Sequence, residues 1–106
     1  MIKCTCFVQE GQSPDRNQSG IQDELNNFSK EAFGADTDIS WIRIAPGNGF
    51  TASQPSTSSV VSITSNTPLK SDQREHLLRK LVALWTAATG CSVDEIVAVI
   101  TDPLAA

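Results

Sequence analysis

Positive charge is scarce in this sequence. Its 106 residues include eight lysines and arginines against twelve acidic residues, which gives a net charge of −4 with the single histidine neutral. A protein that binds DNA or RNA needs a basic face to neutralise phosphate groups. The charge balance therefore argues against nucleic acid as a partner of this chain.

Long hydrophobic runs are also missing. The longest uninterrupted aliphatic run covers residues 96–100, whereas a membrane-spanning helix needs about 20 apolar residues. The segment Met1–Cys6 lacks the long apolar stretch that follows the basic start of a signal peptide. We therefore expect no membrane partner and a cytoplasmic location.

Cysteine and histidine are few, with three cysteines and one histidine in the chain. An odd number of cysteines disfavours a closed disulfide framework, and no second Cys or His cluster completes a metal-ligand set beside Cys4 and Cys6. One histidine in a serine-rich chain argues against a hydrolase with a serine–histidine–acid triad. We interpret the cysteines as reduced thiols packed as small apolar groups, and we expect no metal and no cofactor.

Along the chain, segments with a strand-like pattern alternate with segments that have a helix-like pattern. The predicted elements are a strand at 2–9, a helix between Ser13 and Gly34, a strand at 39–45, a strand at 59–65, a helix between Ser71 and Gly90, and a strand at 96–101. Ser13 is expected to cap the first helix, which Gly20 weakens by about 1 kcal/mol relative to alanine. The last strand is nearly all apolar, which predicts a central place in the sheet.

The order of these elements is β-α-β twice. We predict one domain with residues 1–46 as the first unit, 47–58 as a loop and 59–106 as the second unit. Right-handed crossovers pair the strands of each unit in parallel. The expected fold is α+β, with duplicated β-α-β units forming a four-stranded mixed sheet with two helices on one face. No third helix remains for the other face, so a subunit or a ligand must cover it.

The segments that open the two helices, with several later landmarks, resemble a known family. They are Glu10–Arg16 and Leu69–Glu75, then Pro46–Phe50 after the second strand, and Trp85–Gly90 followed by Asp94–Ile96. In pattern and length, over essentially the whole chain, the sequence resembles the tautomerase superfamily, which includes 4-oxalocrotonate tautomerase, macrophage migration inhibitory factor and the chloroacrylic acid dehalogenases. The resemblance implies a homotrimer whose sheets form a central barrel.

The chemistry of that family depends on a proline directly after the initiator methionine, whose amine acts as base, acid or imine former. This sequence has Ile2 there, and a bulky second residue disfavours removal of Met1. The group at the site is then the primary α-amine of Met1. A primary α-amine keeps a neutral fraction near neutral pH and is able to abstract a proton or form a Schiff base. Met1 is thus the candidate catalytic residue.

The resemblance also implies cationic residues that hold a carboxylate substrate. Lys70 falls where the family has an arginine, and Arg43 is the nearest match to a second arginine in the second strand. Lysine lacks the bidentate fork of arginine but still attracts an anion. From their places in the sequence, Lys3 lies beside the terminus and Phe50 on the long loop is a candidate pocket lid. These four are the predicted substrate-binding residues.

Three functions remain open at this point. The first is a homotrimer with weak keto–enol tautomerase or isomerase activity on small 2-oxo carboxylic acids, catalysed by the N-terminal amine. The second is a non-catalytic trimer of the same fold. The third is a ferredoxin-like module that binds a small molecule, which has the same element order but needs a tight hairpin between the second and third strands. The loop at 46–58 argues against that hairpin.

Overall fold

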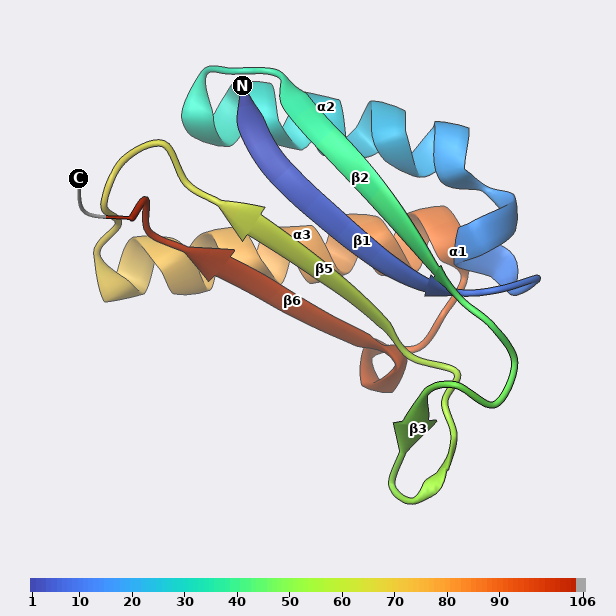
Figure 1. The fold of residues 1–106 in the computed structure, drawn as a ribbon. Coiled ribbons are helices and arrows are strands. Elements are labelled where there is room, and N and C mark those ends of the chain that lie inside the picture. The colour runs from blue at the N-terminus through green and yellow to red at the C-terminus, as the bar shows by residue number, and fades with distance from the viewer. Residues whose placement is uncertain (105–106) are drawn as a thin grey trace.

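The computed structural model describes residues 1–104, whose course is drawn in Figure 1. In chain order the elements are β1 (Ile2–Gln9), α1 (Ser13–Arg16), α2 (Gln18–Phe33), β2 (Thr37–Ile44), β3 (Phe50–Thr51), β4 (Gln54–Pro55), β5 (Ser59–Thr64), α3 (Ser71–Thr89), the 3-10 turn η1 (Val93–Glu95) and β6 (Ile96–Thr101). The four long strands and both helical regions were predicted. The hairpin β3–β4, inside the expected loop, was not.

Four strands form one sheet in the order β2-β1-β5-β6. The pairs β1–β2 and β5–β6 are parallel, and the central pair β1–β5 is antiparallel. Figure 1 shows α2 and α3 on the same face of this sheet. The predicted α+β fold, a mixed four-stranded sheet with helices on one face, is therefore confirmed.

The strand order corrects two expectations. β6 lies at an edge of the sheet, so the prediction that its apolar sequence makes it central is wrong. An apolar run does not distinguish a central strand from an edge strand whose two faces are both apolar. The ferredoxin-like alternative is also wrong, because β2 and β5 are not neighbours and no hairpin pairs them.

The first helix is broken into two pieces at Asn17, and its start is not capped as predicted. Ser13 makes no side-chain cap; its hydroxyl instead donates to the carbonyl oxygen of Thr89 at 2.6 Å. The amide of Asn17 donates to the carbonyl oxygen of Ala88 at 3.0 Å. Both side chains are thus used to attach the start of this helical region to the end of α3.

The core lies between the sheet and the two helices. Alternate residues of β1 and β5 face the helices, which bury their side chains, as the period of two predicts. The fully buried apolar side chains, each with under 2% of its surface exposed, are Ile2, Cys4, Cys6, Val8, Ile21, Leu25, Val61, Ile63, Leu81 and Trp85. Burial on one face only means that the molecule has a second, open sheet face.

The open face carries a continuous apolar row across all four strands. Strand pairing places Phe7 between Ile42 of β2 and Val60 of β5, and places Val60 beside Val97 of β6. Ile42 and Val97 are 43% and 53% exposed. The next row along the sheet is mostly hydroxyl-bearing, since Thr5 lies between Ser40 and Ser62. No helix among residues 1–104 covers this face.

Candidate functional site

The N-terminal amine lies at one end of the sheet, where β1 and β2 begin and β5 and β6 end. We call this the Met1 end, and the opposite end of the sheet the Arg43 end. The backbone N–H of Ile2 donates to the carbonyl oxygen of Asp36 at 2.8 Å, which fixes the first residue of β1. Met1 itself is 83% exposed. Its α-amine is therefore held close to an ordered strand and remains open to solvent.

Lys3 lies two residues from this amine on the open face. Strand pairing places it between Asp38 of β2 and Thr64 of β5. Its neighbour Ile2 points into the core with 1% of its surface exposed. Strand alternation therefore directs the Lys3 side chain away from the helices.

Lys70 lies at the same end, directly before α3. It is the N-cap residue of that helix, with an extended backbone conformation and an exposed side chain. β5 ends at Thr64, and the intervening turn is tied to the sheet by the backbone N–H of Ser65, which donates to Thr101 at 2.8 Å. The positive end of the α3 dipole adds to the charge of this lysine. Three amines from three segments thus share the Met1 end.

Arg43 lies at the opposite end and on the opposite face. It pairs with Val8 across β1–β2, so it shares the helix face with that buried valine. Its partner Val8 is seven residues from Met1 along β1, which corresponds to about 23 Å at the usual rise of a strand. Within one subunit Arg43 cannot contact a small ligand at the α-amine of Met1.

The guanidinium of Arg43 already has a partner. Its Nε and Nη2 donate to the two carboxylate oxygens of Asp15 at 2.9 and 3.0 Å. The side chain of Asp15 is only 6% exposed, and it also accepts the backbone N–H of Gly11 at 2.8 Å. The arginine and this N–H hold the pKa of Asp15 below its usual value. Arg43 therefore attaches α1 to the end of β2.

Phe50 also belongs to the Arg43 end. It lies in the β3–β4 hairpin and is 65% exposed; Figure 1 shows this hairpin projecting beyond the sheet. A small pocket of about 160 Å³ lies at the base of the hairpin, lined partly by Gln9, Ile44 and Pro55. The predicted binding residues are thus divided, with Lys3 and Lys70 near Met1 and the other two far from it.

A larger hollow than this pocket lies elsewhere on the surface. A shallow groove of about 580 Å³ runs along the outer side of α3, with Leu78, Val82 and Val93 in its lining. None of the predicted site residues contributes to it. This groove offers little chemistry, because its lining is mostly apolar and its two charged residues pair with each other.

Sequence reasoning missed two acidic residues that organise the ends of the sheet. Asp15 holds Arg43, and Asp102 holds Arg74. Each pair joins the first turn of a helix to the end of a strand of the same unit. A search for opposite charges at those two places of each β-α-β unit would have found both pairs.

Residues 1–104 contain neither a metal-binding cluster nor a membrane-spanning helix. Within that range no three side chains of Cys, His, Asp or Glu lie close enough together to hold a metal ion. The helices of the same range are too short or too polar to cross a lipid bilayer.

No protein-family model matches the sequence, and no curated protein matches it significantly. Solved structures match its fold closely. The native protein Ps01740 superposes with a TM-score of 0.86 and 20% identity, over 97% of this chain and 95% of that one. The fold is that of the tautomerase superfamily. A fused 4-OT wild-type symmetric trimer has the tautomerase fold too, with a TM-score of 0.81, 13% identity and coverage of 95% and 85%.

The tautomerase fold also relates this chain to a larger protein. Macrophage migration inhibitory factor from Oncomelania hupensis gives a TM-score of 0.71 at 13% identity, over 96% of this chain and 72% of that one. Structural similarity at such low sequence identity establishes the fold alone. The chemistry has to be argued from the residues of this chain.

Proposed function

We propose that this chain forms a homotrimer that catalyses weak keto–enol tautomerisation of small 2-oxo carboxylic acids. The observation that carries the proposal is the exposed α-amine of Met1, which lies at the same end of the sheet as Lys3 and Lys70. An amine with cationic neighbours suits a substrate that has both an acidic enol and a carboxylate.

The reaction needs one base that also serves as an acid. The neutral Met1 amine accepts the proton of the enol hydroxyl, and the O–H electron pair stays on oxygen, which gives an enolate and an ammonium. An oxygen pair then forms the carbonyl π bond while the electrons of the C=C bond take a proton from the ammonium at carbon, which regenerates the amine. Lys3 and Lys70 would hold the carboxylate near the amine through charge-assisted hydrogen bonds. Arg43 and Phe50 are too far from Met1 to contact a substrate bound in the same subunit. They would contact a substrate only at Met1 of a neighbouring subunit.

Assembly into a trimer is supported by the open face of the sheet. The apolar row through Phe7 and Val60 is exposed in a single chain, and burying such a surface favours association. The fused 4-OT structures of the same fold are named as trimers. A cytoplasmic location remains a prediction, which is supported by the interpretation of the cysteines as reduced thiols.

The test is an ultraviolet assay of phenylenolpyruvate ketonisation by the full chain. We expect turnover above the background of buffer alone, and a higher KM for Lys70→Ala. Lys80→Ala, which removes an exposed lysine from the middle of α3, should leave KM unchanged. A variant with Ile2→Pro and with Met1 removed should be faster, because it restores the secondary amine of the family.

Borohydride trapping with pyruvate tests the amine directly. Pyruvate should condense with the Met1 amine to an imine and water, and borohydride should reduce that imine to a stable adduct found on the N-terminal peptide. The absence of both ketonisation and trapping would favour the second candidate, a non-catalytic trimer. That candidate is supported by the 83% exposure of Met1, which leaves the amine without an enclosing pocket.

A further inference from the structure

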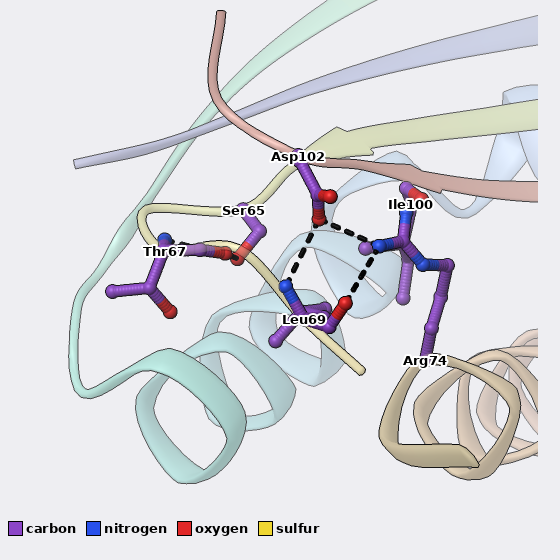
Figure 2. A network of polar contacts seen from close by, with 6 residues as sticks. All are labelled: Ser65, Thr67, Leu69, Arg74, Ile100 and Asp102. Carbon is purple, nitrogen blue, oxygen red and sulfur yellow. Dashed lines mark hydrogen bonds and ion pairs between the residues drawn. The ribbon is translucent and has the colours of Figure 1, made fainter. Parts of the chain in front are cut away.

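The turn before α3 is held by an ion pair that reaches across to the end of β6. Figure 2 shows Arg74 of α3 beside Asp102, with Nη2 of the arginine 2.7 Å from the carboxylate. The same Nη2 donates to the carbonyl oxygen of Leu69 at 3.1 Å, and Nη1 donates to that of Ile100 at 3.1 Å. The carboxylate of Asp102 in turn accepts the backbone N–H of Leu69 at 3.1 Å.

These bonds fix the backbone on both sides of Lys70. The carbonyl of Leu69, which precedes Lys70, accepts from the side chain of Arg74. The carbonyl of Lys70 itself accepts from the backbone N–H of Arg74 at 2.9 Å. One arginine therefore holds both peptide groups that flank the Cα of Lys70, and so sets the direction in which that side chain leaves the chain.

The pair is suited to a fixed geometry. The side chains of Arg74 and Asp102 are only 27% and 40% exposed, whereas those of Arg79 and Glu75, an ion pair one turn further along α3, are 78% and 64% exposed. The guanidinium and the N–H of Leu69 hold the pKa of Asp102 below its usual value, so that the carboxylate stays ionised. Exposed pairs such as Arg79–Glu75 contribute little to the stability of the fold.

We propose that Arg74 and Asp102 are positioning residues, which hold Lys70 in the orientation that binds the substrate carboxylate. This inference rests on the function proposed above. It makes substrate affinity at the Met1 end depend on a pair that touches no substrate. The amine chemistry at Met1 does not depend on the pair.

The first measurement is independent of catalysis. Amide hydrogen exchange should be slow at Leu69 in the wild-type chain and fast in Asp102→Ala, which removes the acceptor. Asp102→Asn keeps an acceptor oxygen for that N–H and should retain most of the protection. If Asp102→Ala fails to fold, Arg74→Lys, which keeps the positive charge, carries the KM test below. Exchange at Leu69 that is already fast in the wild type would overturn the inference.

The second measurement separates binding from chemistry. With phenylenolpyruvate, Asp102→Ala and Arg74→Lys should raise KM about tenfold, the effect of losing roughly one charge-assisted contact, with kcat unchanged. The effect should vanish when Lys70 is already alanine, because no ammonium remains to be positioned. Glu75→Gln is the control and should behave as wild type.

The outcomes distinguish the two proposals. An active enzyme in which Asp102→Ala loses protection at Leu69 but keeps its KM would overturn the positioning role and leave the proposed function standing. An equal rise of KM with and without Lys70 would also overturn it. A wild-type chain that neither converts phenylenolpyruvate nor binds pyruvate would refute the proposed function, and the positioning role with it.

Discussion

Asp15 and Asp102 each hold together one of the two β-α-β units, Asp15 from the helix and Asp102 from just after the last strand. Each accepts an arginine, Arg43 in the first unit and Arg74 in the second, together with a backbone N–H from the loop ahead of the helix. In both cases the arginine is the main cause of a pKa below the usual value. The ionised carboxylates therefore favour the folded chain over the unfolded one.

We predict that acid destabilises the protein through these two groups. An aspartate in the unfolded chain titrates near pH 3.9, and both folded values lie lower, so the unfolded chain binds protons first as pH falls. The stabilisation is complete above the unfolded value and is lost as pH decreases through the folded values. Urea unfolding from neutral pH to about pH 3 should show this loss. If the free energy of unfolding of the double variant Asp15→Asn, Asp102→Asn fell equally steeply with pH, the acid sensitivity could not be assigned to these two carboxylates.

The cysteines differ in burial, and this difference predicts that they react at different rates. Cys4 and Cys6 are buried, with their sulfur atoms 3.9 Å apart, whereas Cys91 is partly exposed. The hydrogen bond with Cys4 and burial both raise the pKa of Cys6. Because the thiolate is the reactive form, these thiols should be inert in the folded state.

A thiol-reactive dye should accordingly label one cysteine of the native chain rapidly and all three in denaturant. Cys91→Ser should remove the fast reaction and leave the slow one unchanged. Rapid labelling of Cys4 or Cys6 under native conditions would show that the face of β1 against the helices opens readily.

At the scale of elements, the break between α1 and α2 depends on a single side chain. Asn17 turns back to bind the carbonyl of Ala88, and its side chain fills the space beside Gly20. A Cβ placed on Gly20 would lie 2.6 Å from Oδ1 of Asn17. The glycine is therefore required by the asparagine, although alanine is the better helix former.

The change in the free energy of unfolding caused by Gly20→Ala should have opposite signs with asparagine and with alanine at position 17. In the wild-type chain we expect a loss of about 1 kcal/mol in the free energy of unfolding, since the Asn17–Ala88 hydrogen bond is displaced. In an Asn17→Ala background the same change should stabilise by up to about 1 kcal/mol through helix propensity. Urea unfolding of the four chains measures both effects, and an equal sign in the two backgrounds would refute the explanation.

For the whole molecule, the open sheet face is the surface through which the proposed trimer would assemble. Its apolar row is formed by one residue from each strand, and Val60 lies near the middle of that row. A charge placed there would have to be buried without a partner in any assembly that covers the face. Oligomerisation should therefore be most sensitive at this position.

Light scattering should find a trimer for the wild-type chain and a smaller species for Val60→Lys. Val93→Lys makes the same chemical change at an exposed valine beside α3, away from the open face, and should remain trimeric. A wild-type monomer or dimer would contradict the proposed assembly. So would a Val60→Lys variant with an unchanged mass.

Local pattern allowed much of this architecture to be predicted. The alternation along β1 and the Gly residues that end α2 and α3 are local signals, and both helices and all four long strands were found from them. The place of β6 at an edge was not predictable, because strand order depends on which segments meet in space. The hairpin of β3 and β4 was missed because its strands are only two residues long.

The candidate site was predictable to a similar extent. Lys3 and Lys70 fall near Met1 because the two β-α-β units pair antiparallel through β1 and β5, which brings the start of the first unit's strands to the end of the second unit's strands. The place of Arg43 on the helix face was not predictable, since a shift of one residue in strand register moves a side chain to the other face. Its neutralisation by Asp15 depends on a contact 28 positions apart in the sequence.

The two ion pairs that join helix to strand have reversed polarity. In the first unit the acid is on the helix and the base on the strand, with Asp15 facing Arg43, whereas in the second unit Arg74 on the helix faces Asp102 after the strand. A chain built from two similar halves is at risk of docking each helix on the wrong half, or on another copy. Such an exchange would set acid against acid and base against base. The reversed polarity thus disfavours the wrong pairing of helix and strand by charge repulsion and favours the correct one.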